Sequence, residues 1–369
     1  MTATVVVKLG SSIVAHEDGR LRREVLRRIC ADLAAARAEG WQVVVVSSGA
    51  IARGVHALGL KRRPRAIEEL QAASAVGQGK LYHAYEEMLH EEGLVSAQVL
   101  LTFEDMAVRS SYLNARQTLR TLLSWGVVPV LNENDTTATD EISFGDNDFL
   151  AAQVAILIDA QLLLLLTGVD GLMSADPSED RNARLISEVD SAGALGAVEV
   201  SERTSPLGSG GMRSKVLAAE MVSAAGIAAV ICNGMREDAL RRALRGERVG
   251  TRFAPRASRA SAFKLWLRHA KPIRGTIAVD EGAARALSSN GTSLLPVGIT
   301  EVEGEFAAGD AVEIMHEGRR IGKGIVNYSS TELSSIQGLN SADVRSKIAN
   351  SVEEAVHRDH MVIEAGQPS

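Results

Sequence analysis

Two lysines stand beside glycines and hydroxyl residues in separate parts of the chain. Lys8 follows an apolar run and precedes Gly10, Ser11 and Ser12, and Lys215 closes the glycine-rich segment 208–215, GSGGMRSK. Glycines let a backbone approach a ligand closely, and backbone N–H groups beside a lysine can bind phosphate. The alternatives are a surface lysine next to a turn for the first segment and a flexible surface loop for the second.

The segment around Lys215 matches neither of the common nucleotide fingerprints. No glycine directly precedes the lysine, as a P-loop requires, and Arg213 stands where the dinucleotide fingerprint has its last glycine. If this segment binds phosphate, it does so in a different fold.

Small and polar residues also follow two other apolar runs. Ser47, Ser48 and Gly49 precede a predicted helix, whose first N–H groups can bind an anion; an ordinary N-cap serine is the alternative. Thr167 and Gly168 follow another run, and their backbone can approach an adenosine.

The densest polar cluster comprises residues 132–137, NENDTT, and 145–148, GDND. Asp135 and Asn147 can hold an ammonium group, whereas Asp148 can orient a catalytic lysine. Asx turns and helix capping account for Asp146 but leave most of the cluster unexplained.

The elements that position these residues alternate along the first part of the chain. Short apolar runs without polar alternation are typical of strands in a parallel sheet covered on both faces. We predict six such strands, at Thr4–Leu9, Gln42–Ser47, Leu94–Leu101, Val127–Leu131, Gln161–Thr167 and Ala228–Cys232. The segments with helical periodicity between them are Leu21–Glu39, Ala66–Glu92, Ser110–Trp125, Asn147–Ile158 and Met212–Gly226. The pattern predicts an α/β/α sandwich with a mostly parallel sheet. Ligands of such sheets bind beyond the carboxyl ends of the strands, where the polar residues lie.

The pattern changes near residue 250, after which short runs separated by Gly, Asn and Asp indicate a small β-rich domain. Its predicted strands are Gly275–Val279, Val297–Val302, Ala311–Ile314 and Ile321–Tyr328. We predict a first domain over 1–250, a linker over 251–270 and a second domain over 271–362.

Composition limits the classes of function. The 369 residues carry a formal net charge of −6, without the basic excess typical of dedicated nucleic-acid binders. Cys30 and Cys232 stand alone, which favours buried thiols over zinc or a disulfide, and the eight histidines show no ligand spacing. We therefore expect no protein-held metal. Neither a signal peptide nor a membrane span is apparent, so we expect a cytoplasmic protein.

Taken together, the loops resemble the amino acid kinase family, in particular its members that phosphorylate glutamate. The resemblance rests on Val7–Ser12, Ser47–Ala52, Leu113–Thr118, Val130–Asp135, Phe144–Asp148, Leu163–Thr167 and Gly210–Lys215. The second domain is similar to a PUA domain, most clearly in Gly275–Gly282 and Gly291–Gly298.

The resemblance implies ATP-dependent phosphorylation of the L-glutamate side-chain carboxylate, with Mg²⁺, as the entry to proline biosynthesis. Lys8 and Lys215 then stabilise the transferring phosphoryl group, Asp148 organises them, and Ser48, Asp135 and Asn147 bind glutamate. The implied ATP-binding residues are Lys8, Thr167, Gly168, Ser209, Gly210, Gly211, Met212, Arg213, Ser214 and Lys215. The resemblance also implies a homo-oligomer, a dimer or tetramer, that is inhibited by proline. One position departs from the family pattern, because many members have Asp where this chain has Gly168.

The proposed chemistry agrees with the residues present. A carboxylate nucleophile is already ionised near neutral pH, so no general base is needed, and Mg²⁺ can bind mainly to the phosphates. Two alternatives remain at this point. The substrate can be acetylglutamate, aspartate or UMP, or the chain can be an RNA-associated module with a degenerate kinase domain; the presence of Lys8, Asp148 and Lys215 argues against the second.

Overall fold

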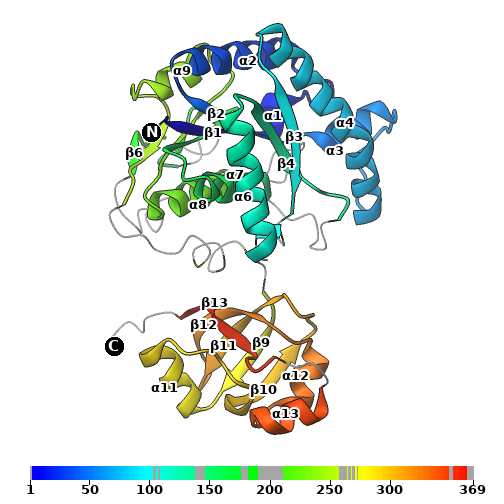
Figure 1. The fold of residues 1–369 in the computed structure, drawn as a ribbon, viewed down its shortest axis with the longest axis vertical. Helices are drawn as coiled ribbons and strands as arrows, with labels where there is room; N and C mark the ends of the chain where they lie inside the picture. The colour runs from blue at the N-terminus through cyan, green and yellow to red at the C-terminus, as the bar shows by residue number, and fades with distance from the viewer. Residues whose placement is uncertain are drawn as a thin grey trace. The chain divides into compact units, whose positions relative to one another are not determined.

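The computed structural model divides the chain into two compact units, Met1–Arg259 and Ala260–Ser369 (Figure 1). It describes residues 2–102, 105–106, 109–137, 146–175, 182–189, 211–256, 264, 267, 271, 273–348 and 352–363. The predicted fold class, a mostly parallel α/β unit followed by a small β-rich unit, is confirmed. No helix within the described ranges is long and apolar enough to cross a membrane.

The described part of the first unit contains one eight-stranded sheet in the order β3-β4-β2-β1-β5-β7-β8-β6. Every neighbouring pair is parallel except β7 and β8. The strands are β1 (Thr4–Leu9), β2 (Gln42–Ser47), β3 (Ser96–Leu101), β4 (Val128–Glu133), β5 (Leu162–Thr167), β6 (Glu188–Val189), β7 (Ala228–Asn233) and β8 (Thr251–Phe253). All six predicted strands are present, and β1 and β5 are buried along their whole length as predicted.

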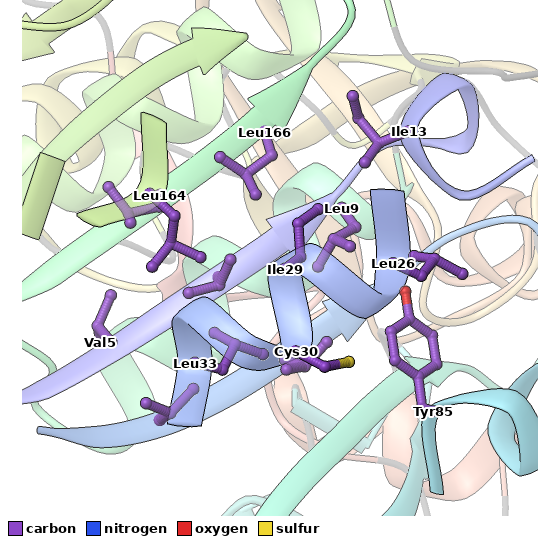
Figure 2. Close-up of a cluster of buried hydrophobic side chains, with 14 of the residues drawn as sticks. Val5, Leu9, Ile13, Leu26, Ile29, Cys30, Leu33, Tyr85, Leu164 and Leu166 are labelled. Carbon is purple, nitrogen blue, oxygen red and sulfur yellow. The ribbon is translucent and has the colours of Figure 1, made fainter. Parts of the chain in front are cut away.

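Helices cover both faces of this sheet. They are α1 (Ser11–Val14), α2 (Arg23–Ala38), α3 (Ala50–Ala57), α4 (Ile67–Glu91), α6 (Arg109–Ser124), α7 (Asp146–Leu157), α8 (Met212–Ala224) and α9 (Ala239–Leu244). On one face, side chains of α2, α4 and α9 form a common core with Val5, Val7 and Leu9 of β1. Figure 2 shows part of this core, where Tyr85 of α4 lies near Cys30 of α2. Because strand side chains alternate between faces, Val6 and Lys8 point to the opposite face, toward α7.

Two predictions about this sheet were wrong in detail. We expected β3 to be buried on both faces, but most of its residues are partly or fully exposed because it is an edge strand, paired with β4 on one side. The predicted linker, 251–270, begins with β8, which pairs with β7. The glycines before it suggested an interruption, whereas Gly250 forms a left-handed turn packed closely against β7.

The second unit has its own five-stranded sheet and its own core, as far as it is described. The strand order is β10-β9-β11-β12-β13, with β9 (Ile273–Val279), β10 (Ile299–Gly304), β11 (Ala311–His316), β12 (Arg319–Val326) and β13 (Val356–Ile363). Helices α11 (Glu281–Asn290), α12 (Ser330–Ile336) and α13 (Ser341–Lys347) and the 3₁₀ turn η2 (Pro296–Gly298) complete it. Its core includes Ile277, Val312, Ile314 and Leu333, all fully buried. The sequence did not predict β13, since this strand carries several polar residues.

Candidate active site

Asp148 lies between the two lysines that the sequence singles out. Its Oδ1 is 2.6 Å from Lys8 Nζ and its Oδ2 is 3.1 Å from Lys215 Nζ. All three side chains are at least 94 % buried, since the exposed fractions are 5, 0 and 6 %. Residues from β1, α7 and α8, far apart in the sequence, thus form one buried charged cluster, Lys8–Asp148–Lys215.

The secondary structure explains this meeting. Lys8 is near the carboxyl end of β1, Asp148 is in the first turn of α7, and Lys215 is near the start of α8. The partial positive charge at a helix N-terminus favours a carboxylate at the position of Asp148. Ser214, the residue before Lys215, donates a hydrogen bond of 2.7 Å to Asp148 Oδ2 and so holds the carboxylate from the same helix.

Burial and mutual charge shift the ionisation of this cluster. Burial lowers the pKa of Lys8, the charge and hydrogen bond of Asp148 raise it, and the charge of Lys215 lowers it; the net result is a pKa of about 8. Burial raises the pKa of Asp148, but the charges of Lys215 and Lys8 and the hydrogen bonds from Lys8 and Ser214 outweigh this and hold it at about 2. With both lysines protonated the cluster has a net charge of +1, which suits a bound anion.

Ser48 and Gly49 lie at the junction between β2 and α3. Gly49 has φ = +102°, a left-handed conformation that favours glycine, and α3 begins at the next residue. Ser48 is 7 % exposed, and its backbone N–H donates to Leu9 O over 3.2 Å. This bond ties the junction to the end of β1, so the predicted anion site at the start of α3 adjoins the strand that carries Lys8.

Asp135 and Asn147 follow β4 and begin α7. Asp135 is partly buried: burial raises its pKa, whereas a hydrogen bond from Ser74 and the charge of Arg63 lower it. Asn147 Oδ1 is buried and has no hydrogen-bond partner among the described residues, so it can accept a hydrogen bond from a ligand. In the described part of the chain, no hydrogen bond or ion pair links Ser48, Asp135 and Asn147 to one another. The fold joins the elements that carry them, because β2 pairs with both β1 and β4, and α7 packs across these strands.

The residues expected to bind ATP lie at the ends of β5 and α8. Thr167 is the last residue of β5 and is nearly buried, and Gly168 follows it; a Cβ added to Gly168 would lie 3.4 Å from Ser12 Oγ. Gly211 is the N-cap of α8, and Met212, Arg213, Ser214 and Lys215 form its first turns. Ser209 and Gly210 lie outside the described residues.

Sequence analysis missed the contribution of α4. Ser74 Oγ donates to Asp135 Oδ2, Asn132 Nδ2 donates to Gln78 Oε1 over 2.5 Å, and the hydroxyls of Tyr85 and Ser47 are 2.9 Å apart. The polar residues at 74, 78 and 85 share one helical face with buried Leu81, a pattern visible in the sequence. Which strands this face meets becomes apparent only from the fold.

This arrangement can neutralise a phosphoryl group at the cluster while a carboxylate is held at the neighbouring strand ends. None of the described residues form a group of three or more His, Cys, Asp or Glu side chains that could hold a metal ion. Both cysteines are free and buried, as expected from their spacing.

Comparison with known proteins identifies the family. The family model described as "Amino acid kinase family" matches residues 3–233, and the PUA domain model matches residues 275–348. A protein named glutamate 5-kinase from Burkholderia thailandensis is 45 % identical over 365 residues, covering 97 % of each chain. One of the same name from Paraburkholderia phytofirmans is 45 % identical over 362 residues, again covering 97 % of each.

Among solved structures, the isopentenyl phosphate kinase of T. acidophilum aligns with a TM-score of 0.48 at 20 % identity, covering 68 % of this chain and 100 % of the other. That likeness is too weak to support a conclusion. The two family models and the two relatives, each of which covers nearly the whole chain, identify the family. The protein is a kinase of the amino acid kinase family, in the group of the glutamate 5-kinases, and it carries a PUA domain.

Proposed function

We propose that this kinase transfers the γ-phosphoryl group of ATP to the side-chain carboxylate of L-glutamate. The product is γ-glutamyl phosphate, and the reaction is the first step of proline biosynthesis. The observation that carries the proposal is the buried Lys8–Asp148–Lys215 cluster at the carboxyl ends of the central strands. The substrate assignment is supported by the relatives that bear the name glutamate 5-kinase.

The two lysines stabilise the group in transfer. Phosphoryl transfer requires the attacking and leaving oxygens to be in line and the charge on the equatorial oxygens to be neutralised. Lys8 and Lys215 are held on opposite oxygens of Asp148, so their ammonium groups are fixed before the substrates arrive. Fixed charges of this kind cost little reorganisation in the transition state.

Glutamate is bound at the neighbouring strand ends by Ser48, Asp135 and Asn147. Asp135 and Oδ1 of Asn147, which has no partner among the described residues, accept hydrogen bonds from the ammonium group. The side-chain carboxylate, ionised at neutral pH, attacks the phosphorus without a general base. Water is kept from the reacting atoms by the burial around Asp148.

ATP is bound through the loop after β5 and the first turns of α8. Thr167 and Gly168 contact the nucleoside, and the segment from Ser209 to Lys215 holds the phosphates, together with Lys8. Mg²⁺ arrives bound to the phosphates as part of the substrate MgATP.

A single assay tests the function and its alternatives. The full-length chain is incubated with MgATP and, in turn, L-glutamate, L-aspartate, N-acetyl-L-glutamate or UMP, and ADP release is followed. We expect release with L-glutamate alone, together with an acyl phosphate that hydroxylamine traps as a hydroxamate. Faster turnover with another acceptor would show that this acceptor, and not L-glutamate, is the substrate. Absence of turnover with all four would favour the RNA-associated alternative.

We further propose that the protein works as a dimer or tetramer, that proline inhibits it, and that the second unit modulates the kinase instead of binding RNA. The segment from Lys271 onward mixes Lys and Arg with Glu and Asp, which argues against a dedicated RNA-binding surface. Light scattering gives the oligomeric state, and turnover with added proline tests the inhibition. Salt-dependent retention of tRNA at micromolar protein concentration would contradict the last point.

A further inference from the structure

Helix α4 turns one polar face toward the sheet. Ser74, Gln78, Leu81 and Tyr85 are spaced by four, three and four residues, so they lie along one side of the helix. Ser74 is 3 % exposed, Leu81 1 % and Tyr85 0 %, which shows that this side is buried. Three polar residues on a buried helix face require partners.

Each of these polar residues bonds to the end of a strand. Tyr85 meets Ser47, the last residue of β2; Gln78 meets Asn132 in the last part of β4; and Ser74 meets Asp135, two residues beyond β4. The same two strand ends carry Ser48 and Asp135, the residues assigned to glutamate. The polar face of α4 therefore lies directly behind the amino-acid subsite.

We propose that Ser74 is a positioning residue for Asp135, and that the polar face of α4 fixes the geometry of the glutamate subsite. This inference rests on the proposed function, in which Asp135 binds the ammonium group of glutamate. Ser74 does not touch the substrate; it acts by orienting the carboxylate that does.

The hydroxyl of Ser74 has a defined electrostatic effect on its partner. A carboxylate binds an ammonium group well only when it is ionised, and partial burial favours the protonated form. The charged group that acts on Asp135 is Arg63, from the segment between α3 and α4. Burial dominates and raises the pKa of Asp135, while the hydrogen bond from Ser74 and the charge of Arg63 limit that rise and favour the charged form. The hydrogen bond also fixes the orientation of the carboxylate.

A purely structural role explains the serine poorly. Within a helix, Ala is more favourable than Ser, and a helical serine commonly bonds to a backbone carbonyl one turn earlier. The hydroxyl of Ser74 instead crosses from α4 to a side chain 61 residues away. The hydroxyl of Ser74, at a buried helix position, bonds to Asp135 and so holds that carboxylate.

The test is Ser74→Ala, which removes one hydroxyl, favours the helix and leaves the fold intact. At neutral pH the KM for glutamate should rise about three- to tenfold, the effect of losing one hydrogen bond, while the KM for ATP stays within about twofold. Loss of the donor should raise the pKa of Asp135. In the pH profile of kcat/KM for glutamate, the acidic limb should therefore move to higher pH. A merely structural serine would not move that limb.

Two further variants make the result specific. Ser223→Ala removes a serine that is equally buried, at 1 % exposure, on α8, and whose hydroxyl donates to Ala254 O; it should change neither KM nor the limb. Ser74→Thr keeps the hydroxyl and should keep the limb at its original pH, even if the added methyl group raises KM.

The outcomes separate this inference from the proposed function. If Asp135→Ala raises the KM for glutamate but Ser74→Ala leaves both KM and the limb unchanged, Ser74 is not a positioning residue and the proposed function stands. If Asp135→Ala itself leaves glutamate binding unchanged, the assignment of Asp135 is wrong and the inference is overturned with it.

Discussion

Lys215 is held by Asp148 and by the start of its own helix, where Nζ lies 3.4 Å from Gly211 O. Its charge is therefore fixed in place, as its proposed role in stabilising the transferring phosphoryl group requires. We expect Lys215→Ala to lower kcat by a factor equivalent to roughly 2–4 kcal/mol, as for other electrostatic stabilisers, with smaller changes in either KM. Steady-state kinetics of the folded variant measure this.

The exposed lysine Lys80 on α4 provides the control, and Lys80→Ala should leave kcat unchanged. An unaltered kcat in folded Lys215→Ala would remove Lys215 from the mechanism.

The lowered pKa of Lys8 has a consequence for pH dependence. In the free enzyme Lys8 is protonated below its pKa of about 8 and loses its charge above it. We therefore expect kcat/KM for ATP to fall as the pH rises through about 8. Bound phosphates attract the ammonium group and raise the pKa of Lys8, so the corresponding fall in kcat should occur at higher pH. A pH profile at saturating glutamate measures both, and coincident limbs would contradict the explanation.

At the scale of elements, the close packing of α3 on α4 depends on two glycines. A Cβ added at Gly77 would lie 1.9 Å from Ala50 O, and one at Gly54 would lie 1.7 Å from Ala73 O. Both atoms belong to backbone, which cannot move without separating the helices. Since α3 begins at the Ser48–Gly49 junction and α4 carries Ser74, this contact sets the spacing between two parts of the proposed glutamate subsite.

Gly77→Ala should therefore destabilise the protein by about 1–3 kcal/mol, the range for an overpacked site, and raise the KM for glutamate. Gly79→Ala is the matched control two residues along the same helix, where an added Cβ meets nothing within 4 Å. There the substitution should stabilise the protein by about 0.5–1 kcal/mol, because alanine is the better helix former. Thermal unfolding and glutamate kinetics of the two variants test the contrast; equal effects would rule out the steric explanation.

The sequence predicts the strands better than it predicts the contacts between elements. The bounds of β1 and β2 are predicted to the residue, because buried parallel strands are continuous apolar runs. Lys8 could be selected because it follows an apolar run, Lys215 because it follows a glycine cluster, and Asp148 because it lies in the densest polar cluster. The role of Ser74 could not be predicted, since it depends on α4 crossing behind β2 and β4. The burial of β3 was mispredicted because apolar content does not reveal which strand is at an edge.

At the scale of the whole molecule, residues 251–256 are anchored to the kinase unit. Thr251 is fully buried, donates to Ile186 O over 2.6 Å and accepts from Leu172 N over 2.8 Å. Arg256 N donates to Ser223 O over 2.9 Å, and Arg256 Nη2 is 3.6 Å from Glu220 Oε1. The first unit therefore extends beyond residue 250, where the sequence suggests a boundary.

We expect a chain that ends at Arg259 to remain folded and to keep glutamate-dependent ATP turnover, because every candidate site residue lies before this point and the first unit has its own core. A chain that ends at Gly250 loses β8 and the side chain of Phe253, which is 1 % exposed, and should unfold at lower temperature or aggregate. Calorimetry and turnover of the two truncations distinguish these outcomes. A folded but inactive chain ending at Arg259 would mean that the second unit is needed for catalysis.

The central position of β1 bears on how the protein is made. β1 pairs with β2 on one side and with β5 on the other, where Val5 is opposite Leu162. At ordinary rates of translation, β5 follows β1 from the ribosome after roughly ten to thirty seconds. Until then Val5, Val6 and Val7, which are fully buried in the native sheet, have only half of their final partners. The nascent chain must therefore protect this central, buried strand during synthesis, and this strand is where we expect a chaperone to bind or aggregation to begin.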